Sequence, residues 1–245
     1  MKRFQIIVEY DGTKFVGWQR QKNGLSIQQV IEEAIEKISH QKVTLQCAGR
    51  TDSGVHALGQ VAHFDLDGSW FPDKIRDGVN HFTSSRRISI LKADQVSNDF
   101  NARFDALQRS YLYRILNRRS PVALEKDRVW WIPSILDYEA MGKAGKILLG
   151  KHDFSTFRAA GCQSKSSIKT LDNLIVSKIG DEIRVFAEAR SFLYRQIRNI
   201  VGALCLVGEG KWSIEDFEYA FNAKDRKQGG ATAPASGLYF VKVKY

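Results

Sequence analysis

The chain has 245 residues, of which 43% are hydrophobic and 26% charged, as in globular proteins with a buried core and unlike disordered chains. No apolar run approaches the roughly 18–20 residues of a membrane-spanning helix, and the N-terminus does not read as a signal peptide. Lys and Arg number 37 against 27 Asp and Glu, a net charge of +10 that fits a polyanionic partner such as nucleic acid, or solubility alone.

The first part of the chain predicts alternating strands and helices. FQIIVEYDGTKFVGW (4–18) is typical of a strand, a hairpin turn at Asp11-Gly12 and a second extended stretch. From Ser26, apolar residues recur every three or four positions, and Ser26 with Gln29 fits a capping box, which predicts a helix over 26–39. Further elements are expected as strands near 43–48 and 60–66, a helix over 72–82, and a strand near 87–93.

The second part repeats this order of elements without repeating the sequence. We expect a strand over 107–117, a helix over 137–149, strands over 169–178 and 182–190, helices over 191–207 and 213–223, and a C-terminal strand. Residues 98–106 follow neither the helical nor the strand periodicity, which places the boundary between the two halves there. The sequence therefore predicts an α+β protein with two ferredoxin-like (β-α-β-β-α-β) halves, 1–104 and 105–245. Their antiparallel or mixed sheets would lie side by side, with helices on one face and a basic cleft between them.

Residues 47–58, CAGRTDSGVHAL, place charged and polar side chains between glycines in a loop that joins two predicted strands. Asp52 is ionised at neutral pH and flanked by glycines that let a ligand approach, which favours a nucleophile or an electrostatic stabiliser over a general base. An Asx-turn, in which Asp52 bonds its own backbone, explains the same residues. The local sequence leaves both interpretations open.

Three other chemistries fit the sequence poorly. GEGKW (208–212) lacks the spacing and the Ser/Thr of a phosphate-binding loop, and Ser53 lacks the surroundings of a triad serine. The five histidines show no zinc-site spacing, so no metal is expected. The three cysteines are far apart and form no CxxC pair, which favours reduced thiols in a cytoplasmic protein.

Two distant stretches favour a nucleic-acid site. In QRSYLYRILN (108–117), strand alternation places Arg109, Tyr111 and Tyr113 on one face, where they could stack a base and hold a phosphate, or where the tyrosines could simply pack in the core. In RSFLYRQIRNIVGAL (190–204), Arg195, Arg198 and Gly202 form a helical stripe. That stripe could contact a ligand or be a solvated basic face.

Taken together, these stretches resemble the TruA type of tRNA pseudouridine synthases. The resemblance runs through nearly the whole chain and is most specific in GRTDSGVHA. Its motifs are EYDGTKFVGWQRQ (9–21), SIQQVIEEAI (26–35), CAGRTDSGVHALGQVAHF (47–64), GVN (78–80), FNARFDALQRSYLYRILN (100–117), GKHDFSTFRAAGC (150–162), FLYRQIRNIVGAL (192–204) and ATAPASGLYFVKV (231–243). After GVN the chain reads HFTSSRR, where the family usually has a short run ending in Leu-Pro.

The resemblance implies roles for five residues. Asp52 matches the family's essential aspartate, which attacks the uridine at C1′ or C6. Tyr111 matches the tyrosine that stacks on the base and helps to remove its C5 proton, and Arg198 matches the arginine that pairs with the aspartate. Arg50 and Arg103 resemble arginines that hold RNA.

The implied enzyme isomerises uridine to pseudouridine without a cofactor or a metal. Its implied substrate is the tRNA anticodon stem-loop at positions 38–40, and its implied form is a homodimer in the cytoplasm. A non-catalytic tRNA-binding protein or RNA chaperone with the same basic cleft is the main alternative, and an unrelated aspartate-dependent hydrolase is a third.

Overall fold

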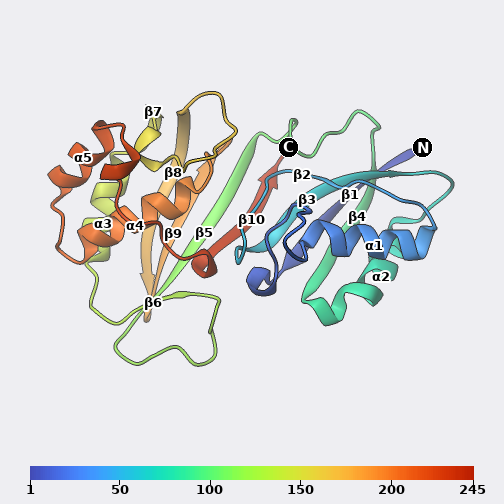
Figure 1. The fold of residues 1–245 in the computed structure, drawn as a ribbon, viewed down its shortest axis with the longest axis horizontal. Coiled ribbons are helices and arrows are strands. Elements are labelled where there is room, and N and C mark those ends of the chain that lie inside the picture. The colour runs from blue at the N-terminus through green and yellow to red at the C-terminus, as the bar shows by residue number, and fades with distance from the viewer. The chain divides into compact units, whose positions relative to one another are not determined.

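The computed structural model describes residues 1–245 and confirms a mixed α+β fold. The chain divides into two compact units, one formed by Met1–Leu107 with Tyr239–Tyr245 and the other by Gln108–Leu238 (Figure 1). The predicted boundary between residues 104 and 105 lies close to the end of the first segment. The C-terminal strand, which we assigned to the second half, contributes to the first unit.

The first unit is built on a sheet with the strand order β4-β1-β3-β10. Strand β1 (Lys2–Tyr10) is central and antiparallel to both β3 (His56–Leu66) and β4 (Ile88–Val96). The two-residue strand β2 (Gln46–Cys47) also pairs with β3, and β10 (Leu238–Lys244) pairs with β3 in parallel. Its elements follow the order β1, α1, β2, β3, α2, β4, while the ferredoxin-like description of the two halves stays a prediction.

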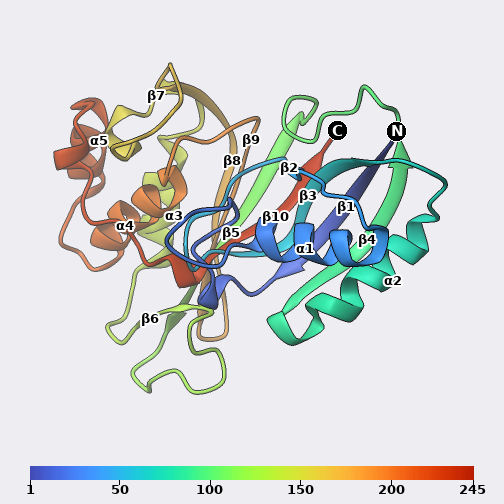
Figure 2. The same ribbon diagram turned by 45° about the vertical axis from the view of Figure 1, so that its right-hand side comes forward.

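Helices α1 (Ile27–Ser39) and α2 (Pro72–Thr83) lie against each other on one face of this sheet (Figure 2). The hydroxyl of Ser26 accepts a hydrogen bond from the Gln29 backbone and caps α1, as expected. The predicted capping box is only half present, because the Gln29 side chain donates to Glu33 instead. Alternating side chains of β1, among them Phe4 and Val8, are fully buried and form the core of this unit.

The predicted hairpin at Asp11-Gly12 is wrong. Strand β1 ends at Tyr10, and a single 3-10 turn (Gly12–Lys14) follows, with the Asp11 carboxylate accepting from the Thr13 backbone as its cap. The partners of β1 are β3 and β4, which come later in the chain. Asp-Gly therefore serves here as a helical cap and not as a two-residue strand connection.

The second unit has the strand order β5-β9-β8-β7. The buried helix α4 packs against α3 and contacts α5 and β5. Gly180 turns the chain between β8 and β9 with a φ of +58°. The elements are β5 (Gln108–Asn117), β6 (Trp130–Ile132), α3 (Tyr138–Lys146), β7 (Gly150–Asp153), β8 (Ile168–Ile179), β9 (Glu182–Ala189), α4 (Gln196–Gly208) and α5 (Ile214–Asn222).

Helix α4 begins five residues later than the predicted helix over 191–207. Arg195 adopts a left-handed conformation with a φ of +57°, and the Gln196 side chain accepts from the Leu193 backbone, so residues 191–195 form an irregular turn. Strands β6 and β7 were not predicted, because three or four residues are too short to show a period of two. None of the helices combines the length and apolar character that crossing a membrane requires.

Candidate active site

The loop after β2 is held by residues 10–18, the last residue of β1 and the stretch that follows it, which we call the supporting segment. The Trp18 backbone donates to the Thr51 carbonyl at 3.1 Å, and the hydroxyls of Tyr10 and Thr51 lie 2.7 Å apart in a buried hydrogen bond. Asp52 itself forms an isolated antiparallel bridge with Gly17. The loop turns back toward β3 through a hydrogen bond from the Val55 backbone to the Asp52 carbonyl. The backbone of Asp52 is therefore held from two sides, by Gly17 of the supporting segment and by Val55 of its own loop.

Glycine is required at two positions where these segments meet. A Cβ atom on Gly12 would lie 1.9 Å from the Val55 carbonyl oxygen. Gly17 has a φ of +110°, and a Cβ atom there would lie 2.6 Å from the Thr51 oxygen. The glycines of EYDGTKFVGW thus let this segment pack closely against the Asp52 loop.

The Ser53 and His56 side chains are both bound to this supporting segment. The Ser53 hydroxyl donates to the Phe15 carbonyl at 3.0 Å. His56 is buried, accepts from the Gly12 backbone through Nδ1 and stacks on Tyr239 at 4.8 Å. These contacts indicate that both side chains stabilise the loop, against a Ser-His-Asp triad.

Asp11 anchors the same corner of the fold. Burial opposes its ionisation, but hydrogen bonds from Thr13 and Arg87 and the nearby His56 ring hold the pKa of its carboxyl well below the ordinary value. The Arg87 guanidinium lies 2.9 Å from the Asp11 carboxylate. The segment that departs from the family pattern after Asn80 thus supplies an ion pair next to the supporting segment.

A Ser53→Ala substitution tests the scaffold role of the serine. We expect a loss of about 1 kcal/mol in the free energy of unfolding, since one hydrogen bond disappears, and no change in the rate of the chemical step. Chemical denaturation and a single-turnover activity assay measure the two quantities. A rate loss of several orders of magnitude would restore the triad interpretation.

Arg50 and Arg103 lie near one thiol of the first unit. Burial raises the pKa of Cys47 to about 12, and the positive charges of Arg50 and Arg103 both act against that rise. Both arginines are exposed. Both predicted RNA-binding residues are therefore within electrostatic reach of Cys47, at the end of β2.

Phe104, which follows Arg103, was not among the predicted site residues. Its ring is 72% exposed, and the Arg103 guanidinium lies over it at 5.6 Å. The Asn101 side chain accepts from the backbones of both Arg103 and Phe104, which fixes the segment. An exposed aromatic ring beside a cation is a feature of surfaces that stack nucleobases, and the adjacent Arg-Phe in FNARF was the signal in the sequence.

Tyr111 and Tyr113 separate the two interpretations of strand β5. Tyr113 is fully buried, its hydroxyl donates to the Pro234 carbonyl at 2.7 Å, and burial raises its pKa well above the ordinary value. Tyr111 is half-buried and meets Phe192 edge to face, with 5.1 Å between ring centres. Tyr113 is therefore a core residue, whereas Tyr111 lies at the margin of the core.

Arg198 lies in the first turn of α4. Its Nε donates to the Ala233 carbonyl at 2.8 Å, next to the Pro234 carbonyl that binds Tyr113. The positive charge of Arg198 acts against the rise in the Tyr113 pKa. Gly202, in the stripe that could contact a ligand or be a solvated basic face, lies against the Ala231 carbonyl, 1.9 Å from where its Cβ atom would be.

The predicted site residues are thus divided between the two units. Asp52, Arg50 and Arg103 belong to the first, and Tyr111 and Arg198 to the second. No three His, Cys, Asp or Glu side chains come together in a way that could hold a metal ion.

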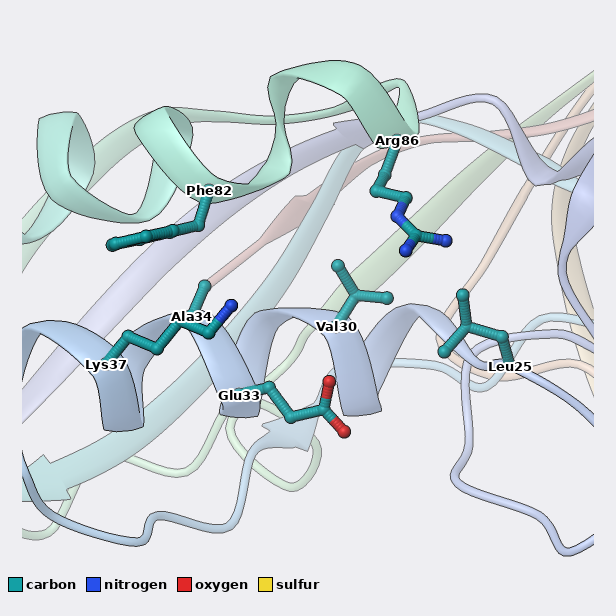
Figure 3. Close-up of a pocket in the computed structure, with 7 residues that line it drawn as sticks. All are labelled: Leu25, Val30, Glu33, Ala34, Lys37, Phe82 and Arg86. Atoms are coloured by element: carbon teal, nitrogen blue, oxygen red, sulfur yellow. The ribbon is translucent and has the colours of Figure 1, made fainter.

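A shallow hollow of about 90 Å³ lies on the first unit, between α1 and α2 (Figure 3). Lys37 extends over the Phe82 ring at its edge, 5.0 Å from the ring centre. None of the predicted site residues lines it; the lining residues are Leu25, Val30, Glu33, Ala34, Lys37, Phe82 and Arg86.

The model of a family described as tRNA pseudouridine synthase matches residues 6–105 and 144–245. This chain belongs to the tRNA pseudouridine synthase family. Curated relatives named tRNA pseudouridine synthase A include proteins of Paramagnetospirillum magneticum, 54% identical over all of this chain and 96% of the relative, and of Sinorhizobium medicae, 52% identical over the whole of both. A relative from Rhodospirillum centenum is 51% identical, again over the full length of both chains.

Membership of the tRNA pseudouridine synthase family makes the protein an isomerase that converts uridine to pseudouridine. The ranges that match the family model include Asp52, Arg50, Arg103 and Arg198. Tyr111 lies in the stretch between the two matched ranges, within the full-length similarity to the curated relatives.

Proposed function

We propose that this protein isomerises uridine in the anticodon stem-loop of tRNA, at positions 38–40, with Asp52 as the nucleophile. The family supports the reaction and the tRNA substrate. The observation that carries the role of Asp52 is its surroundings: Thr51, Ser53 and His56 all bond to residues 10–18, the end of β1 and the segment after it. The loop around the carboxylate is therefore rigid, which is what a nucleophile requires.

The chemistry needs few groups. The Asp52 carboxylate bonds to C1′ or to C6, the N-glycosidic bond between C1′ and N1 breaks, and the base rotates. A bond then forms between C1′ and C5, the bond to Asp52 breaks and restores the carboxylate, and N1 takes up a proton. The hydrogen on C5 must then leave as a proton, and Tyr111 assists this step while its ring stacks on the base. Arg198 pairs with the carboxylate, and no step requires a cofactor or a metal.

RNA binding is assigned to the basic residues. Arg50 and Arg103 hold phosphates near the target, and Phe104 offers a ring on which a splayed base can stack. The target uridine must leave its own stack to react, so aromatic side chains replace the lost base–base contacts. We further propose that the enzyme works as a homodimer in the cytoplasm.

The proposed specificity has a direct assay. A tRNA transcript made with [5-³H]uridine releases tritium when the C5 hydrogen is displaced, and we expect release from transcripts with uridine at positions 38–40. Matched transcripts with cytidine at those positions control for other uridines and should release none. Release from the cytidine transcripts would contradict the proposed position, and binding without release from any transcript would favour the RNA chaperone.

Tyr111→Phe separates stacking from proton transfer. The ring remains, so we expect tRNA affinity within a few-fold of wild type, whereas loss of the hydroxyl lowers the single-turnover rate about 100-fold or more. The control is Tyr219→Phe on α5, whose side chain is 75% exposed and which should leave both quantities unchanged. Full activity of Tyr111→Phe would show that stacking alone matters.

A further inference from the structure

The chain that follows α5 crosses back over α4 as a segment we call the strap, residues 229–234. The strap lies very close to the helix, since a Cβ atom on Gly202 would be 1.9 Å from the Ala231 oxygen. At its start, a Cβ atom on Gly229 would lie 2.5 Å from the Thr156 oxygen. Gly202 on α4 and Gly229 at the start of the strap therefore permit close backbone contacts that a side chain would prevent.

Three polar side chains fasten the strap to α4. The Arg226 guanidinium donates to the Gly230 carbonyl at 2.7 Å, to the Asn199 side-chain oxygen at 3.1 Å and to the Thr232 hydroxyl at 2.9 Å. The Thr232 hydroxyl in turn donates to the same Asn199 oxygen at 2.6 Å. Asn199 is fully buried, and its amide nitrogen donates to the Phe157 carbonyl. The geometry of all three side chains is therefore fixed.

The strap also holds Arg198, the neighbour of Asn199. The Ala233 backbone donates to the Arg198 carbonyl at 3.1 Å, and the Ala233 carbonyl accepts from the Arg198 Nε at 2.8 Å. Strap and arginine thus bind each other through both main chain and side chain. Any shift of Ala233 must change the position of the guanidinium.

We propose that Arg226 is a positioning residue for the reaction. With Asn199 and Thr232 it fixes the strap on α4, and the Ala233 carbonyl then orients the Arg198 guanidinium. Catalytic groups displaced by about 1 Å can lose roughly 100-fold in rate, so a support of this kind matters even without contact to the substrate. The inference rests on the proposed role of Arg198.

The test begins with two variants of Thr232. Thr232→Val keeps the shape and removes the hydroxyl, whereas Thr232→Ser keeps both hydrogen bonds. At saturating tRNA we expect Thr232→Val to slow single-turnover pseudouridine formation roughly 10- to 100-fold with tRNA affinity unchanged, and Thr232→Ser to match wild type. Arg226→Met should reproduce the loss, and a melting curve for each variant gives the fraction folded under assay conditions.

Repeating the Thr232→Val substitution in an Arg198→Lys enzyme distinguishes positioning of the Arg198 guanidinium from a general loss of structure. Arg198→Lys keeps the positive charge but cannot reproduce the Nε bond to Ala233, so in this background Thr232→Val should slow the reaction less than two-fold further. Equal slowing in both backgrounds, or a loss that follows only the unfolded fraction, would overturn the positioning role. An Arg198→Lys enzyme as fast as wild type would show that the orienting bond is dispensable, whereas failure of wild type to form pseudouridine would instead contradict the proposed function.

Discussion

Replacing Asp52 by asparagine is expected to abolish pseudouridine formation while leaving tRNA affinity within a few-fold of wild type. The amide has nearly the shape of the carboxylate but is neutral and a very weak nucleophile. The contacts that hold the loop come from Thr51, Ser53 and His56 and do not require the charge. We therefore expect a rate loss of roughly 10⁴-fold or more in a folded protein.

Tritium release from [5-³H]uridine tRNA under single-turnover conditions measures the rate, and filter binding measures the affinity. Asp67→Asn is a suitable control, because that carboxylate belongs to the same unit and is 69% exposed. It should behave as wild type. Turnover by Asp52→Asn at a rate close to that of Asp67→Asn would show that Asp52 is not the nucleophile.

The second large effect is expected from Gly17→Ala. The new Cβ atom would lie 2.6 Å from the Thr51 oxygen, in a residue with a φ of +110°, so the Asp52 loop or the supporting segment must move. Strain in the backbone costs about 1–3 kcal/mol, and a displaced carboxylate loses roughly 100-fold in rate. Both stability and activity should fall.

Gly180→Ala provides the matched control for backbone strain without a clash. Gly180 also has a positive φ, +58°, and nothing lies within 4 Å of its would-be Cβ atom. We expect a loss of about 1 kcal/mol in the free energy of unfolding and an unchanged rate per folded molecule. A Gly17→Ala enzyme with normal rate would mean that the loop tolerates the displacement and that its rigidity is not needed.

The long periodic elements of the fold could be predicted from the sequence, because amphipathic spacing and caps act locally. The Ser26 cap of α1 and the Pro72 start of α2 are examples. Contacts between segments that lie far apart in the sequence could not be predicted in this way. The Asp11-Gly12 pair has the composition of a hairpin, but the fit of Gly12 against Val55 decides its conformation.

The candidate site likewise combines features that the local sequence indicates with long-range contacts that it does not indicate. A local reading left Asp52 open between a turn and a nucleophile, and only the distant motifs and their family resemblance favoured the second. The supports of the site were beyond prediction, because they join residues far apart: Arg226 to Asn199 across 27 positions and Asn199 to Thr232 across 33. Phe104 was visible in the sequence, but its exposure was not.

The most direct test of the central claim is a map of pseudouridine in tRNA from cells that lack this protein. Complementation with wild type and with Asp52→Asn completes the experiment. We predict that pseudouridine at positions 38–40 disappears in the deletion, returns with wild type and does not return with Asp52→Asn. Pseudouridine that persists at these positions in the deletion strain, or that Asp52→Asn restores, would contradict the account.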